Sequence, residues 1–318
     1  MPPYNIIIER KAMVNWFIYI LSFLFLFIVL FLIYFIGNRE NLDISELKSD
    51  EEYLFFENSH GKTAYYSIGS DEGEPLILIH GVTVPSYYYK KIADSLSQIG
   101  YKVYAYDHFG RGFSDRPKIK YDMFTFEKQL DDFISHLSLD TVTLLGVSMG
   151  GALASNYSAK NPSKVKSLIL NVPFVGSQTI GLGNFASIPL LWDFYLRFFI
   201  INRLVERGFG LTEDDQDPDH FIKQFSVVGT QNSFSSLMKN FITHDFYNDY
   251  KIINHNKTPV HITYAVDDED VPVDSILKAI DIIPYANTFS FEGGHNIINS
   301  KTEEIISLIN DFKSKLDD

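Results

Sequence analysis

No charged residue interrupts the mostly apolar segment from residue 14 to residue 36. As an α-helix it would be about 35 Å long, which exceeds the roughly 30 Å hydrocarbon core of a bilayer. Trp16 and Tyr34 lie toward its two ends, where aromatic side chains favour the membrane interface. A cleaved signal peptide is the alternative, but its apolar region is normally about 7–15 residues and precedes a small-residue cleavage site, which residues 35–38 do not offer. We therefore expect residues 1–37 to be an uncleaved, single-pass transmembrane anchor.

The charges that flank this anchor bear on its orientation. Arg10 and Lys11 precede the apolar segment, whereas Arg39 and Lys48 follow it among several acidic residues. The positive-inside rule favours a cytosolic N-terminus for this arrangement, which would place the rest of the chain outside the cytosol. The polar stretch 38–52 is interpreted as a linker between the anchor and a folded domain.

Short β-rich runs alternate with helical patterns through the rest of the chain, apart from one long interruption. This alternation predicts right-handed crossovers and a mostly parallel sheet flanked by helices, the α/β class. The sheet domain is expected in two parts, residues 53–173 and 256–318. The expected strands are 53–57, 63–68, 76–79, 103–106, 141–145, 165–170, 260–266 and 289–291, and the expected helices include 88–98, 126–137, 273–282 and 303–315.

Residues 174–255 break this rhythm and are predicted to form a helical insertion over the carboxyl edge of the sheet. Residues 188–205 are apolar on most sides of a helix, and the acidic stretch 213–217 follows them. Two interpretations stay open. The insertion could be a lid that presents an apolar wall to a substrate or a membrane, or it could simply pack onto the domain.

A glycine-rich hexapeptide, residues 146–151, lies between a predicted buried strand and a predicted helix. It contains G-x-S-x-G around Ser148, the pattern of a nucleophile elbow. Small residues at Gly146 and Gly150 allow the strand and the helix to approach each other closely. The alternative is a glycine-rich turn that carries a serine by chance. His80, Asp107 and Ser148 all lie at carboxyl ends of predicted strands, where sites form in parallel sheets.

A serine hydroxyl needs a base within hydrogen-bond reach, and the base needs a partner that fixes its tautomer. An acidic cluster, residues 267–270, follows a late strand, and His295 follows Gly293-Gly294 after the last strand. The order Ser…Asp…His is that of the α/β-hydrolase fold. The chain from about residue 60 to residue 316 resembles this family. The motifs that carry the resemblance are His80-Gly81, residues 107–114, residues 146–151, residues 268–272 and residues 293–295.

The resemblance implies Ser148 as the nucleophile, His295 as the base and Asp268 as the acid that orients the base. Asp268 lies four positions before Pro272, as in the family's D-x-x-x-P turn, and its neighbours Asp267 and Asp270 are rivals for the role. The backbone N–H groups of Met149 and Val82 are expected to form the oxyanion hole. The turn after His80 reads Gly-Val-Thr and so departs from the His-Gly-Gly-Gly form of some esterases.

Three further motif residues have structural interpretations. We expect His80 to hold its loop through a hydrogen bond, and Asp107 and Arg111 to order their own turn. The alternative of Asp107 as a nucleophile requires an aspartate in place of Ser148 at the elbow, as in epoxide hydrolases and haloalkane dehalogenases.

Composition excludes several classes of function. The formal net charge of −13 and a pI near 5.1 argue against nucleic-acid binding. The chain has no cysteine, so disulfides, cysteine-ligated zinc and a cysteine nucleophile are excluded. Neither a phosphate-binding G-x-x-x-x-G-K-[ST] motif nor a convincing metal-ligand pattern is present, and we expect no cofactor.

We therefore expect a membrane-anchored serine hydrolase that cleaves carboxylic esters through an acyl-enzyme. The elbow and the anchor are similar to those of monoacylglycerol lipase-like and lysophospholipase-like members, which implies a lipid substrate. A C–C bond hydrolase or a perhydrolase would keep the same triad, and a non-catalytic receptor or scaffold with this fold is the alternative from another class.

Overall fold

A mixed sheet forms the centre of the protein in a computed structural model, which describes residues 3–36, 40–47, 53–176, 188–201, 203, 218–241 and 244–317. The described strands form one eight-stranded sheet in the order β1-β2-β4-β3-β5-β6-β7-β8. The β1–β2 and β2–β4 pairs are antiparallel and all others are parallel, as the sequence pattern predicts. The strands are β1 (Leu54–Asn58), β2 (Gly61–Ile68), β3 (Glu74–Ile79), β4 (Tyr101–Tyr106), β5 (Val142–Val147), β6 (Val165–Asn171), β7 (Val260–Ala265) and β8 (Asn287–Phe291).

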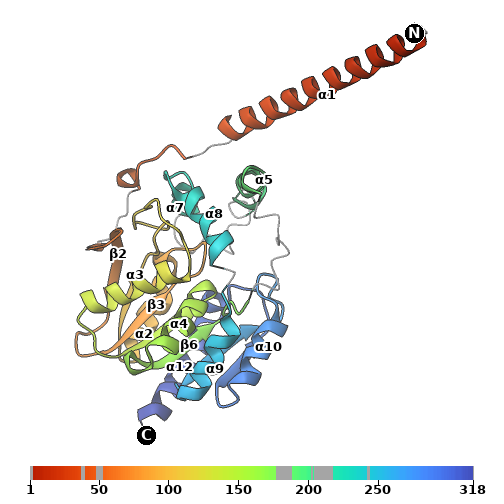
Figure 1. Ribbon diagram of the computed structural model, residues 1–318. Helices are drawn as coiled ribbons and strands as arrows, with labels where there is room; N and C mark the ends of the chain where they lie inside the picture. The colour runs from red at the N-terminus through yellow and green to blue at the C-terminus, as the bar shows by residue number, and fades with distance from the viewer. Residues whose placement is uncertain are drawn as a thin grey trace.

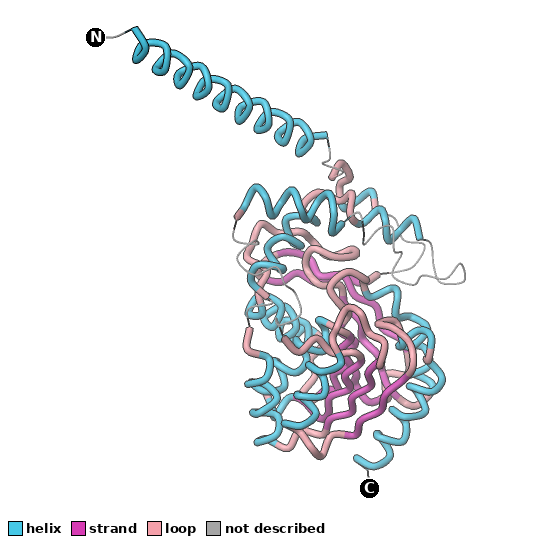
Figure 2. Tube along the Cα trace, turned by 90° about the vertical axis from the view of Figure 1, so that its right-hand side faces the viewer, coloured by secondary structure: helices cyan, strands magenta, loops and turns pink. Residues whose placement is uncertain are grey.

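Helices cover both faces of this sheet and bury two apolar clusters (Figures 1 and 2). One cluster packs α3 (Met123–His136), α4 (Met149–Lys160), α9 (Phe246–Asn256) and α10 (Val273–Ile282) against the sheet. The other packs α2 (Lys90–Gln98) and α12 (Thr302–Asp317) against the opposite face. Helix α3 begins earlier than its apolar pattern suggests, because the Asp122 side chain caps it by accepting a hydrogen bond from Thr125 N.

The insertion contributes α5 (Pro189–Tyr195), the π-helix η6 (Leu196–Ile200), α7 (Pro218–Gln224) and α8 (Thr230–Asn240). Trp192 of α5 donates a hydrogen bond from Nε1 to Ser235 Oγ of α8 at 3.1 Å, so these helices pack together. Helix α9 packs on α4 and α10 among the core helices, although its residues fall in the range predicted for the insertion. The acidic stretch 213–217 lies outside the described residues.

The apolar N-terminal segment forms α1 (Pro3–Ile36), which projects away from the rest of the chain (Figure 1). Its stretch Lys11–Leu32 has a mean hydropathy of 2.5, and none of its residues is buried against the rest of the protein. By length and composition this stretch could cross a membrane, and a signal sequence near an N-terminus would look the same.

The stretch predicted as a linker is ordered where the structure describes it, at residues 40–47, which we call the strap. Asn41 N and Leu42 N both donate hydrogen bonds to Ser226 O at 2.9 Å, just after α7. Val228 N donates to Leu42 O at 3.0 Å in return. The polar composition of residues 38–52 gives no sign of this docking, because backbone hydrogen bonds do not depend on side-chain type.

Candidate active site

Ser148 occupies a strained turn between β5 and α4. Its φ of 54° and ψ of −118° lie in a region that L-residues rarely adopt. Any side chain at the flanking glycines would clash with the backbone. A Cβ on Gly150 would lie 2.0 Å from Ile79 O, and one on Gly146 would lie 2.4 Å from Gly150 O. The predicted close approach of strand and helix is therefore confirmed, and it holds the half-buried Ser148 side chain at the carboxyl edge of the sheet.

The loops after β7 and β8 bring Asp268 and His295 together. His295 Nδ1 lies 2.7 Å from Asp268 Oδ2, and the Asp268 side chain is completely buried. Asp268 Oδ1 accepts hydrogen bonds from the backbone N–H groups of Asp270 and Val271, at 2.8 and 2.9 Å. Because the carboxylate only accepts, the proton between the two side chains belongs to Nδ1, which leaves Nε2 as the free acceptor of the ring.

The two rivals of Asp268 have other surroundings. Asp267 joins the two loops, since its Oδ2 accepts a hydrogen bond from Gly293 N at 3.1 Å and its N–H donates to Gly293 O at 3.2 Å. Asp270 is exposed and lines a cavity. The structure thus pairs His295 with Asp268, at the position that the D-x-x-x-P spacing indicates.

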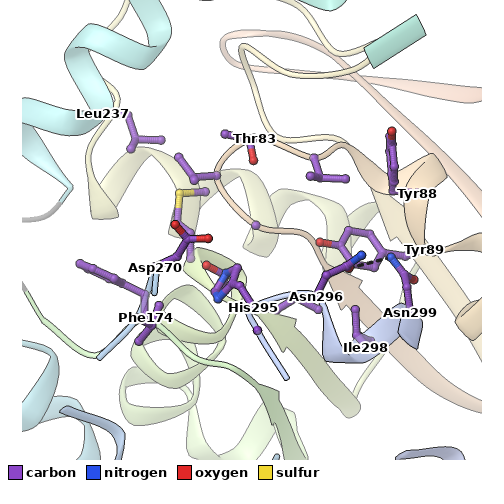
Figure 3. Close-up of a pocket in the computed structure, with 18 of the residues that line it drawn as sticks. Thr83, Tyr88, Tyr89, Phe174, Leu237, Asp270, His295, Asn296, Ile298 and Asn299 are labelled. Atoms are coloured by element: carbon purple, nitrogen blue, oxygen red, sulfur yellow. Dashed lines mark hydrogen bonds between the residues drawn. The ribbon is translucent and has the colours of Figure 1, made fainter. Parts of the chain in front are cut away.

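A cavity of about 540 Å³ contains Ser148 and His295 in its wall, a volume within the usual range for small-molecule sites. In Figure 3, Phe174, Leu237 and Asp270 lie on one side of His295, and Asn296 and Asn299 lie on the other. Most of the lining is apolar or aromatic, and much of it comes from the insertion. The apolar and aromatic lining residues are Val82, Val84, Tyr88, Tyr89, Val147, Met149, Phe174, Ile200, Phe234, Leu237, Met238, Phe241, Val271 and Ile298.

Val82 and Met149 also line this cavity. The turn before Val82 crosses close to the serine, because a Cβ on Gly81 would lie 3.4 Å from Ser148 Cβ. In the part of the chain that the structure describes, neither the Val82 N–H nor the Met149 N–H donates a hydrogen bond. Unpaired N–H groups at these two positions are what an oxyanion hole requires.

His80 is a structural residue, as predicted. It is fully buried, its Nδ1 lies 2.7 Å from Gly81 O, and its Nε2 accepts a hydrogen bond from His108 N at 2.9 Å. His108 in turn places Nε2 3.1 Å from His80 O. Burial lowers the pKa of His80 well below its usual value and that of His108 to about 3. Both rings are therefore neutral near pH 7 and hold the loop that carries Val82.

Asp107 orders its turn, as predicted. Its two carboxylate oxygens accept hydrogen bonds from Ser86 N and Phe113 N, both at 2.8 Å. Burial raises the pKa of this carboxyl group. Asp107 does not line the cavity, and both of its oxygens accept backbone hydrogen bonds. It is therefore not placed to act as a nucleophile.

Arg111 makes contacts that the sequence pattern did not reveal. Its Nε donates to Val82 O at 2.5 Å, and its Nη1 donates to Gly110 O at 2.8 Å and to Ser233 Oγ of α8 at 2.7 Å. Its guanidinium carbon lies 3.5 Å from the centre of the Phe234 ring. Burial lowers the Arg111 pKa to about 9. This side chain connects the peptide of Val82 to the insertion, and only its place within Gly-Arg-Gly hinted at a special role.

Residues 74–200 match a protein family described as alpha/beta hydrolase fold. That segment contains β3 to β6 and the turn at Ser148. The chain has the α/β-hydrolase fold.

Relatives with this fold have diverse activities. The cis-3-alkyl-4-alkyloxetan-2-one decarboxylase of Shewanella oneidensis is 23% identical over 291 residues, covering 82% of this chain and 88% of that protein. The proline iminopeptidase of Lactobacillus helveticus is 28% identical over 297 residues, covering 81% of this chain and 96% of that protein. A solved carboxylesterase of Nitrososphaera gargenis superposes with a TM-score of 0.67 at 19% identity, covering 83% of this chain and 98% of the other. These similarities show the fold but do not single out the expected monoacylglycerol lipase-like or lysophospholipase-like members.

Among the described residues, one group of side chains in this site has the spacing of metal ligands. Asp268, Asp270 and His295 each offer a ligand atom, and the three atoms lie within 4.8 Å of one another. Both oxygens of Asp268 already accept hydrogen bonds, one of them from His295. A metal ion here would replace the His295–Asp268 hydrogen bond, so the group is better explained by that bond.

Proposed function

We propose that the protein is a serine hydrolase of carboxylic esters with Ser148, His295 and Asp268 as its catalytic triad. The observation that carries the proposal is the buried Asp268–His295 pair, which opens onto the same cavity as the strained Ser148. A base with its tautomer fixed by a carboxylate, in the same cavity as a half-buried serine on an elbow, suits acyl transfer.

In this mechanism Ser148 Oγ attacks the ester carbonyl carbon while His295 Nε2 accepts the hydroxyl proton. The carbonyl oxygen becomes an oxyanion and receives hydrogen bonds from the N–H groups of Val82 and Met149. Collapse of this intermediate breaks the bond to the alcohol, which leaves with the proton from His295. Water then loses a proton to His295 and attacks the acyl-enzyme, and the carboxylic acid leaves as Ser148 regains its proton.

The apolar character of the cavity favours an ester with a lipid-like acyl group, such as a monoacylglycerol or a lysophospholipid. Phe174 and Leu237 offer an apolar surface on one side of His295, and the Asn296 and Asn299 amides offer polar groups on the other (Figure 3). We further propose that α1 remains attached as a membrane anchor and that the insertion acts as a lid over the cavity. The basic residues Arg10 and Lys11, which precede the apolar part of α1, support an extracytosolic position for the hydrolase domain, which protease protection of sealed vesicles would test.

A substrate panel tests the proposed reaction. Detergent-solubilised full-length protein would be assayed with soluble esters of graded acyl length, monoacylglycerols and lysophospholipids. Wild-type protein is expected to release fatty acid, with rates that rise as the acyl chain lengthens. The variant Ser148→Ala should lose this activity, and Ser135→Ala, which alters an exposed serine of α3, should retain it. Equal ester hydrolysis by wild type and Ser148→Ala would refute the proposal.

A further inference from the structure

The strap is attached to the insertion by more than its backbone. Glu40 Oε1 accepts a hydrogen bond from Gln231 N in the first turn of α8, at 2.5 Å. Leu47, at the other end of the strap, is 95% buried, since only 5% of its surface is exposed. It belongs to the apolar cluster that also contains Phe225 and Val227 of the insertion. The strap is therefore bonded to the insertion through Glu40, Asn41 and Leu42, and its Leu47 end is buried in the apolar core.

A local hydrogen-bond pair keeps the strap folded between these ends. Asp43 caps the short helix η1 (Ile44–Glu46) by accepting a hydrogen bond from Ser45 N at 2.9 Å. Glu46 Oε1 accepts one from Asp43 N at 2.8 Å, which completes a capping box. The strap is therefore folded, whereas a flexible linker would sample many end-to-end distances.

Chain length then limits how far the insertion can lie from the end of α1. Four peptide steps separate Ile36 from Glu40, and an extended chain covers at most about 3.6 Å per residue, so the two Cα atoms lie within roughly 14 Å. The polar layer on each side of the hydrocarbon core is only about 5–8 Å thick. If α1 spans a bilayer, Glu40 and the start of α8 bonded to it therefore lie within a short distance of the bilayer surface.

The insertion exposes large apolar side chains at this end of the molecule. Val228, which is bonded to the strap, is 60% exposed, and Ile222 of α7 is 40% exposed. Figures 1 and 2 show α5 and α7 at the end of the molecule from which α1 leaves. Three more exposed apolar residues belong to the N-cap of α5, to α5 and to η6, and we call the set of five the cap patch. The cap patch consists of Ile188, Leu191, Phe199, Ile222 and Val228.

We propose that the strap holds the cap patch against a lipid bilayer, so that the cavity receives its substrate from the membrane. Ile200 follows Phe199 on η6 and lines the cavity, so η6 contributes to both the patch and the cavity lining. The substrate class that follows is an amphiphilic ester embedded in the bilayer. This inference rests on the proposed anchor and ester hydrolysis, and it adds the surface and the route by which the substrate arrives.

The absence of cysteine makes a site-specific test direct. Single cysteines at Val228, Ile222 and Leu24 would be labelled with an environment-sensitive fluorophore in full-length protein reconstituted into phosphatidylcholine vesicles. Leu277→Cys on α10 is the matched control, because Leu277 and Ile222 are both 40% exposed. Lipids that carry a spin label near the headgroup, and others that carry it deep in the acyl chain, would serve as quenchers. Soluble-ester hydrolysis would be measured on the same samples.

We expect deep quenching at position 24, shallow quenching at positions 222 and 228, and none at position 277. Quenching at position 24 alone would overturn the proposal, and protection of positions 222 and 228 with a doubled particle mass would instead assign the cap patch to a second copy of the chain. Lack of quenching at position 24 would overturn both the anchor and the membrane contact. None of these outcomes depends on soluble-ester hydrolysis, whose loss would count against the proposed reaction alone.

A second variant links the contact to activity. The pair Ile222→Asp and Val228→Asp adds two carboxylates to the cap patch, and neither residue lines the cavity. We expect hydrolysis of a vesicle-embedded ester to fall about tenfold, corresponding to about 1.4 kcal/mol, with soluble-ester hydrolysis unchanged. An equal fall in hydrolysis of both substrates would contradict a specific role of the patch in membrane contact, and so would unchanged hydrolysis of both.

Discussion

Replacing Asp268 with asparagine would separate the catalytic role of this residue from its structural role. One oxygen of Asp268 accepts two backbone N–H bonds, from Asp270 and Val271, and the other faces His295 Nδ1 at 2.7 Å. Asparagine has the same shape but only one acceptor oxygen. The two backbone donors require that oxygen, so the amide NH₂ group must face Nδ1.

An NH₂ group opposite Nδ1 forces the imidazole proton onto Nε2. His295 could then no longer accept the proton of Ser148. The equivalent change in a characterised serine protease lowers kcat by about 10⁴, and the same tautomer argument applies here. At about 1.36 kcal/mol per tenfold, this is a loss of roughly 5 kcal/mol of transition-state stabilisation. The free energy of unfolding should fall by only about 1–2 kcal/mol, because both backbone hydrogen bonds remain but lose their charge.

The assay is kcat and KM for a soluble ester at pH 7–8, with the folded state of each variant checked by thermal unfolding. Asp267→Asn and Asp270→Asn are matched controls, and both should retain kcat within about tenfold because neither faces His295 Nδ1. Retention of more than a tenth of wild-type kcat by Asp268→Asn would refute the tautomer argument. A larger loss in Asp270→Asn would transfer the orienting role to that residue.

Three further changes probe the surroundings of the site. Gly150→Ala would place a Cβ 2.0 Å from a backbone carbonyl of β3, so thermal unfolding should show a loss of about 1–3 kcal/mol or more, whereas Gly176→Ala, whose Cβ meets only an ordinary 3.6 Å contact, should be neutral. Arg111→Met removes the donor to Val82 O at 2.5 Å, and steady-state kinetics should show kcat falling about 10–100-fold with KM less affected. Burial and a nearby lysine lower the pKa of His261 to about 4, so its neutral folded form gives stability that is lost as pH falls from about 6.5 toward 4. Unfolding free energies of wild type and His261→Asn should therefore differ in slope by up to about 1.4 kcal/mol per pH unit in that window, and parallel curves would contradict the shift.

Most of the core could be predicted from the sequence because its signals are local. β-Branched runs that alternate with helical patterns indicate a parallel sheet, and the eight described strands appear in the expected segments. The glycines around Ser148 predict a close approach of β5 and α4, since no side chain fits there. The His295–Asp268 contact was predictable only by resemblance, through the spacing to Pro272, because nothing local distinguishes Asp268 from its acidic neighbours.

Contacts between distant segments could not be predicted. The strap pairs Leu42 with Val227 through backbone groups, which leave no pattern in either segment. The bonds of Arg111 to Val82 and Ser233 depend on how the insertion packs over the sheet. Likewise, α9 has an amphipathic pattern that suits an insertion helix as well as a core helix, and only its packing against α4 places it in the core.

Covalent labelling of the nucleophile is the most direct test of the proposed mechanism. A fluorophosphonate reacts with an activated serine and leaves a stable adduct, whose position peptide mass spectrometry identifies. On detergent-solubilised full-length protein we expect one adduct, on Ser148, with labelling slowed by His295→Ala and abolished by Ser148→Ala. An unlabelled wild-type protein, or an adduct on another serine in a Ser148→Ala variant that still hydrolyses esters, would contradict it.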